Sequence, residues 1–114
     1  MNGTAMRQAV ASALGNVPDV RGFAYRPGTP APGDVWPLLS FMDRAQGDAF
    51  VGTWRVRVLL PQDEEAASVW MDAHWDDLYY ALKPLGYVQR MAPVLLAAAG
   101  GDLYALEITM IAEE

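Results

Sequence analysis

The sequence predicts an α+β fold: a mainly antiparallel or mixed sheet of about four to five strands, a short N-terminal helix and one long helix packed on the sheet. A helical apolar pattern runs from Gln62 to Leu85. Apolar side chains alternate along Ala49–Leu60, as in a half-buried strand. Polar turns at Asp43–Asp48 and Gly100–Asp102 each separate two apolar runs, which indicates two hairpins joined by the long helix.

The N-terminal part predicts a short helix, a strand and a proline-rich loop. Thr4 is the expected N-cap of the helix, Gly15 and Asn16 are its expected stop, and its apolar positions are Met6, Val10, Ala13, Leu14 and Val17. Val20–Tyr25 is a predicted strand. Prolines cannot donate to a ladder, so residues 26–33 are expected to form an exposed loop that can reach a neighbouring subunit through Pro27, Pro30 and Pro32.

Two later strands contain proline. Val35–Met42 includes Pro37, which favours an edge strand or a bulge. Tyr87–Ala98 includes Pro93, where we expect a bulge. Both strands are therefore predicted to depart from a regular central ladder.

Charged residues are expected on one face of the sheet. The alternating strand turns Arg55 and Arg57 away from its apolar face. The closing strand, Leu103–Ala112, places Glu107 on its less apolar face. Arg55, Arg57 or Arg90 is therefore expected to pair with Glu107 across strands.

The long helix has clear start and stop signals. Asp63 is the expected N-cap, Glu64 and Glu65 complement the helix dipole, and Pro84 with Gly86 ends the helix. At 100° per residue the predicted core stripe is Ala67, Met71, His74, Leu78 and Leu82, with Trp75 at its margin. The opposite, solvent-facing strip is Glu65, Asp72, Asp76 and Lys83.

A second apolar flank lies between the stripe and the strip. Its members are Ala66, Val69, Trp70, Ala73, Tyr80 and Ala81. Either the helix is sunk deep between sheet and loops, or this flank packs on another subunit, because exposed aromatic patches usually mark interaction sites.

Composition limits the function classes. The 114 residues predict a single domain spanning residues 1–114, and 53% hydrophobic content is enough for a core and a subunit interface. The absence of cysteine excludes a disulfide scaffold and a thiolate metal site. A net charge of −6 argues against a protein that grips nucleic-acid phosphates, and no segment predicts a secretory signal or a membrane span.

No catalytic pattern stands out. His74 and Asp77 have helical i,i+3 spacing, but two ligands do not make a metal site, and a structural histidine at the core margin is the favoured interpretation. Neither a nucleophile elbow nor a phosphate-binding glycine loop is present. We therefore expect no enzyme activity, no cofactor and no metal.

The overall pattern resembles the tail terminator proteins of long-tailed phages that infect actinobacteria. The resemblance spans nearly the whole chain, and its most specific parts are the strand, Leu-Pro-x-Asp and helix passage from Val58 to Leu82 and the closing strand LYALEITMIAE. It implies an α+β virion protein that forms a ring, expected to be hexameric, on the end of the tail tube. Such a ring stops tube polymerisation and provides the head-docking surface. The implied partners are other copies of the chain, the tail tube protein and a head-completion or connector protein.

Candidate surfaces follow from these two lines of reasoning. The candidate subunit interface comprises Trp70, Tyr80, Val69, Ala73, Pro27, Pro30 and Pro32. An acidic surface would let DNA pass through a ring without specific binding, and the candidates for it are Asp43, Asp48, Glu65, Asp72 and Asp76.

Two alternatives stay open. A head–tail connector or tail tube subunit would share the size and acidity of this chain. A small bacterial ligand-binding or enzymatic α+β domain would instead need a polar-lined pocket.

Overall fold

A computed structural model describes residues 2–113 and confirms the α+β fold. Two helices accompany one five-stranded sheet in the described chain. The elements are α1 (Gly3–Gly15), β1 (Arg21–Gly22), β2 (Asp34–Arg44), β3 (Phe50–Leu59), α2 (Glu64–Leu82), β4 (Tyr87–Leu96) and β5 (Leu103–Glu113).

The sheet has the strand order β1-β2-β3-β5-β4. The β2–β3 and β4–β5 hairpins are antiparallel, β3 pairs antiparallel with β5, and only the short β1 runs parallel to its neighbour β2. Helix α2 therefore carries the chain from β3 past β5 to the far edge, where β4 begins. This is the predicted pair of hairpins joined by a crossover helix.

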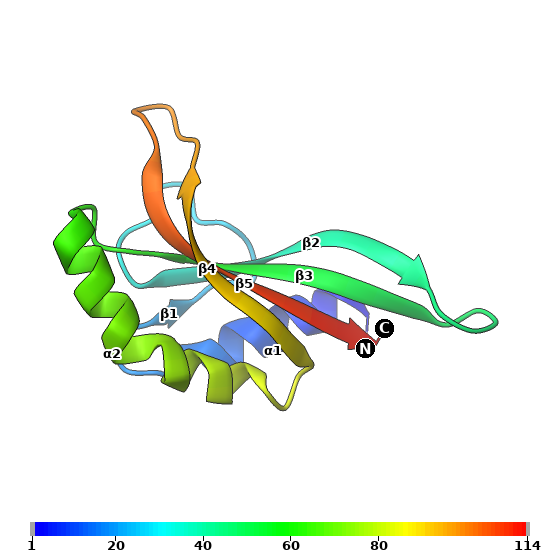
Figure 1. The fold of residues 1–114 in the computed structure, drawn as a ribbon. Coiled ribbons are helices and arrows are strands. Elements are labelled where there is room, and N and C mark those ends of the chain that lie inside the picture. The colour runs from blue at the N-terminus through cyan, green and yellow to red at the C-terminus, as the bar shows by residue number, and fades with distance from the viewer. Residues whose placement is uncertain (1, 114) are drawn as a thin grey trace.

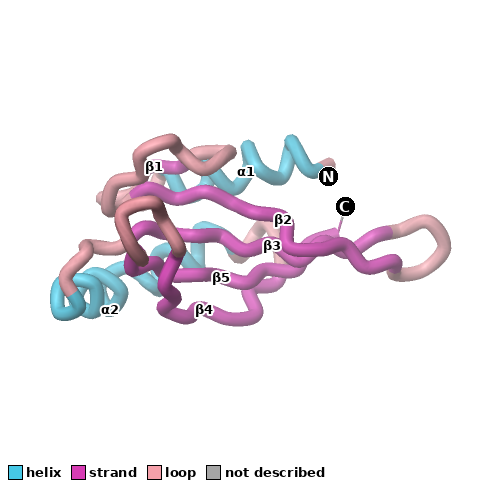
Figure 2. Tube along the Cα trace, turned by 90° about the horizontal axis from the view of Figure 1, so that it is seen from above, coloured by secondary structure: helices cyan, strands magenta, loops and turns pink. Residues whose placement is uncertain are grey.

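Both helices lie on the same face of the sheet (Figures 1 and 2). Helix α1 packs near β1 and β2, whereas α2 packs near β4 and β5. Between the helices and the sheet lies one apolar core, which includes Met6, Val10, Leu14, Trp54, Val56, Val58, Leu78, Leu82, Leu106, Ile108 and Met110. The helix layer therefore covers one face of the sheet and leaves the other without helices.

The helix-free face has a smaller apolar cluster at one end only. It contains Trp36, Leu59, Leu96 and Ala105, with Phe23, Leu38, Val94 and Leu103 packed against them. The ends of β4 and β5 that join at residues 97–102 turn away from the helix layer (Figure 1). This upturned hairpin closes one end of the helix-free face, and the rest of that face is open.

The β2–β3 hairpin projects beyond the helix layer (Figures 1 and 2). Four large apolar side chains on this arm are exposed: Leu39, Phe41, Met42 and Phe50. The principal extents of the molecule are 47 × 29 × 21 Å, which agrees with an elongated shape. Neither described helix is long and apolar enough to cross a membrane.

Several local predictions were wrong. Helix α1 is capped by Asn2, whose side chain accepts from the Ala5 amide at 2.8 Å, so Thr4 lies inside the helix. The predicted strand Val20–Tyr25 pairs over only two residues, because the chain leaves β2 after Gly22.

The two prolines in strands lie at sheet edges, but neither forms a bulge. β1 reaches only as far as Val35, so Pro37 lies on the open edge of β2, as predicted. The irregularity in β2 comes later, at Ser40. In β4 the register shifts at Gln89, whereas Pro93 pairs regularly with Leu106, so the bulge predicted at Pro93 is wrong. An edge strand tolerates Pro93 because one side of its backbone needs no ladder partner.

Gly22 lets α1 approach the sheet closely. A Cβ atom at this position would lie 1.9 Å from the Ala11 carbonyl oxygen, which belongs to the backbone of α1. Backbone cannot move away as a flexible side chain can, so any larger residue must displace the helix.

We predict that Gly22→Ala lowers the free energy of unfolding by about 1–3 kcal/mol, the usual cost of overpacking. Thermal unfolding followed by circular dichroism measures the change. Gly28→Ala is the control, because a Cβ at Gly28 meets nothing within 4 Å. Equal melting temperatures for the two variants would contradict the close approach.

Candidate functional site

Helix α2 begins and packs largely as predicted. The Asp63 carboxylate accepts from the Ala66 amide at 3.0 Å, which confirms the N-cap. Of the predicted core stripe, Ala67, Leu78 and Leu82 are buried, and Met71 and His74 are half-buried. Trp75 was placed at the margin of this stripe, and it lies 53% exposed beside Met91 and Pro93 of β4.

The second apolar flank of α2 is buried in part and exposed in part. Trp70 and Ala81 are half-buried against the core, whereas Ala66, Val69, Ala73 and Tyr80 are exposed. Val69 and Tyr80 have exposed fractions of 62% and 65%. These four side chains are therefore not sunk within a single chain, whereas Trp70 and Ala81 are partly sunk.

The exposed flank and the acidic strip form one continuous surface. At 100° per residue, its members point away from the core within about one quadrant of the helix. We call it the α2 outer surface, and it consists of Glu65, Val69, Asp72, Ala73, Asp76 and Tyr80, all exposed. Three interface candidates, Val69, Ala73 and Tyr80, therefore share this surface with three lumen candidates, Glu65, Asp72 and Asp76.

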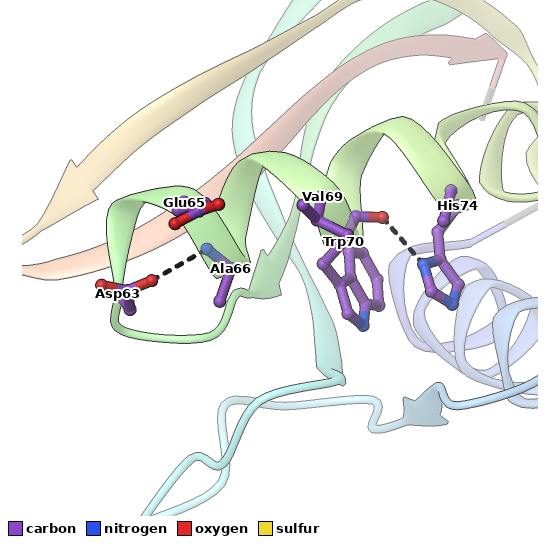
Figure 3. Close-up of a pocket in the computed structure, with 7 residues that line it drawn as sticks. Asp63, Glu65, Ala66, Val69, Trp70 and His74 are labelled. Carbon is purple, nitrogen blue, oxygen red and sulfur yellow. Dashed lines mark hydrogen bonds between the residues drawn. The ribbon is translucent and has the colours of Figure 1, made fainter.

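A shallow hollow of about 460 Å³ lies beside the first half of α2. Figure 3 shows the side chains of Trp70 and His74 projecting together from the same side of the helix. Their rings stack with centroids 4.0 Å apart, and His74 Nδ1 lies 2.8 Å from the Trp70 carbonyl oxygen. The hollow therefore has a fixed aromatic wall next to the α2 outer surface.

His74 does not pair with Asp77. Its Nε2 lies 3.4 Å from Asp19 Oδ2, a contact between residues 55 positions apart that spacing along a helix cannot reveal. In residues 2–113 no group of three or more potential metal ligands comes together. The ring is held by Trp70 and Asp19, which is the geometry of a structural histidine.

An Arg–Glu–Arg network lies on the helix-free face. Arg55 Nη1 donates to Glu107 Oε1 at 2.6 Å, and Arg57 Nε donates to Glu107 Oε2 at 3.2 Å. Arg55 Nε also donates to Ser40 Oγ at 3.1 Å. The predicted pairing of Glu107 is thus made by Arg55 and Arg57, while Arg90 takes no part in it.

A hollow of about 300 Å³ opens beside this network, and we call it the Arg90 hollow. It is lined by Phe41, Thr53, Arg55, Gln89, Arg90 and Thr109. Thr109 of β5 pairs in register with Arg55 of β3 on one side and with Arg90 of β4 on the other. The three side chains therefore lie in one row across three neighbouring strands. Among residues 2–113 no acidic side chain pairs with Arg90, which is exposed.

Two bulges enrich this hollow in polar groups. The irregularity in β2 lets Ser40 reach Arg55, and the irregularity in β4 adds Gln89 beside Arg90. Bulges re-aim side chains and increase local twist. Neither bulge had a signal in the sequence, and the hollow was missed for that reason.

The proline-rich loop folds back on the domain. The Asp34 carboxylate accepts from the Ala31 amide at 2.9 Å and lies 2.7 Å from Arg21 Nη2. Pro27 and Pro30 are half-buried, and only Pro32 is exposed among the three candidate prolines. The projecting element is instead the β2–β3 arm, on which Asp43 and Asp48 are both exposed.

The chain matches no protein-family model and no curated protein sequence.

We predict that Glu107→Gln lowers the free energy of unfolding by about 1–3 kcal/mol, because two arginines lose a charged acceptor. The Glu107 side chain is only 12% exposed, so water replaces this acceptor poorly. Asp102→Asn, at an exposed turn, is the control. Chemical denaturation measures both, and a Glu107→Gln variant as stable as the control would show that the network contributes little.

Proposed function

We propose that this protein is the subunit of a homo-oligomeric ring, and specifically a tail terminator of a long-tailed phage. The observation that carries the ring is the α2 outer surface, where Val69, Ala73 and Tyr80 lie exposed on the most regular element of the fold. Contiguous exposed apolar surface of this kind usually marks an interface. The terminator assignment rests further on the resemblance of the strand, helix and closing-strand pattern.

The arrangement of layers favours a ring over a two-fold dimer. Helices cover one face of the sheet, and the other face is open, so the two free surfaces of the chain lie on opposite sides. Unlike surfaces on opposite sides make head-to-tail contacts, which close into rings when the rotation fits.

In the proposed mechanism, one side of the ring matches the last ring of the tail tube and the other presents a different surface to the head. Growth of the tube stops because that second side accepts no further tube subunit. The net charge of −6 suits a channel through which DNA passes without being held. The virion is the proposed location.

Two other functions make different predictions. A tail tube subunit would assemble into long tubes rather than discrete rings. A small ligand-binding domain is favoured by one observation, the polar-lined Arg90 hollow, and would stay monomeric while taking up its ligand.

Light scattering of the purified protein over a range of concentrations tests the ring. We expect a discrete species near six chains, seen as rings by negative-stain electron microscopy. Added to polymerising tail tube protein, this species should cap and shorten the tubes. A protein that stays monomeric alone and also leaves tube length unchanged would refute the proposal.

We predict that Val69→Asp shifts the protein toward folded monomers, because a carboxylate replaces an apolar contact in the interface. Ser68→Asp adds the same charge at the neighbouring exposed position, outside the α2 outer surface, and should assemble normally. Trp70→Asp is a poor probe because Trp70 packs on the core. If the Val69 and Ser68 variants assembled equally well, the α2 outer surface would not be part of the interface.

A further inference from the structure

We infer that the α2 outer surface of one copy docks on the open helix-free face of the next, with its middle carboxylates seated at the Arg90 hollow. The inference rests on the proposed self-association and specifies which two surfaces meet. The occupant of the Arg90 hollow is thus a second copy of this chain.

Charge complementarity is the first argument. Arg55 and Arg90 line the hollow, Arg55 shares the Glu107 carboxylate with Arg57, and Arg90 has no acidic partner among residues 2–113, so the hollow keeps a positive excess in a chain of net charge −6. The α2 outer surface has the opposite character: its three carboxylates, Glu65, Asp72 and Asp76, outnumber the one neighbouring cation, Lys83, whose Nζ lies 5.9 Å from the Tyr80 ring centroid. Complementary potentials of this kind fix the register of two partners and suppress wrong ones.

The apolar residues of the two surfaces also correspond. On α2, Val69, Ala73 and Tyr80 lie beside the carboxylates, on one side of them. Around the hollow, Phe41 and Tyr87 are exposed, and Ile111 is half-buried between them in register. Each surface therefore offers exposed apolar contact next to charge.

Shape supplies the third argument. The 19 residues of α2 are about 28 Å long at 1.5 Å each, enough to cross four strands spaced about 4.8 Å apart. The upturned β4–β5 hairpin closes one end of the open face, and the β2–β3 arm extends past the other (Figure 1). A docked helix would complete a helix–sheet–helix arrangement, a stable way to bury both faces of a sheet.

The polar groups at the hollow fit a carboxylate. Arg90 donates to no described residue, and Thr53, Thr109 and Gln89 add hydroxyl and amide donors around it. An arginine can bind a carboxylate through two parallel hydrogen bonds. Asp72 and Asp76 lie at the centre of the α2 outer surface, so they are the residues expected to reach Arg90.

Charge reversal and rescue test this contact. Arg90→Glu should raise the protein concentration at which half of the chains are assembled by about tenfold or more, since it places a glutamate next to the α2 carboxylates. Adding Asp76→Arg or Asp72→Arg to that variant should restore assembly in at least one case. Asp77→Arg gives the same net charge but lies about 100° around the helix from Asp76, so it should not restore assembly.

The outcomes distinguish failure of the proposed contact from failure of the proposed ring. Assembly of Arg90→Glu at wild-type concentrations, or rescue by Asp77→Arg as good as by Asp72→Arg and Asp76→Arg, would overturn the contact and leave the ring standing. A monomer at all concentrations would overturn it as well, and uptake of inorganic phosphate by that monomer, lost in Arg90→Glu, would assign the hollow to a small anion. Circular dichroism confirms folding, and Arg90→Gln replaces Arg90→Glu if the latter unfolds.

Discussion

The structure depends on a single constraint, the burial of only one face of the sheet. Helix α2 returns the chain from the centre of the sheet to its far edge and packs on the same side as α1. Trp54, Ile108 and Met110 then lie in one core with residues of both helices. The opposite face has only a small apolar cluster at one end, so its arginines and aromatic residues stay accessible.

This one-sided burial explains why the two exposed sides of the chain, the outside of the helix layer and the open face of the sheet, differ in character. The outside of the helix layer is acidic and apolar, and the open face of the sheet is basic and apolar around Arg90. Two surfaces of opposite charge on opposite sides favour assembly of copies in one direction. A terminator needs the same property, because a ring must close laterally and still present different ends to the tube and the head.

Much of the fold could be predicted from local patterns. The N-cap Asp63, the alternating strand and the two hairpin turns are short-range signals, and all three agree with the structure. Two misses had non-local causes, because register placed the bulge at Gln89 instead of Pro93 and packing left Trp75 about half exposed. The third was local: Asn2 caps α1 by accepting from the Ala5 amide, and Asn is as good an N-cap as Thr.

The candidate site was predictable only in part. The exposed apolar residues of α2 followed from helical periodicity, but Trp70 turned out to support the core and leave Val69 and Tyr80 outermost. The Arg90 hollow required the strand order and two bulges, which bring β2, β3, β4 and β5 together on one face. Residues so far apart in sequence show no common pattern.

Disulfide cross-linking tests the head-to-tail contact most directly, because the chain has no cysteine of its own. In the double variant Ala73→Cys/Gln89→Cys, which keeps Asp76 and Arg90, the two thiols lie on opposite sides of one chain and cannot meet within it. Oxidation of the assembled protein should give a ladder of covalent species that ends at the closed ring. Absence of cross-links, or a ladder that stops at two chains as in a two-fold dimer, would contradict the account.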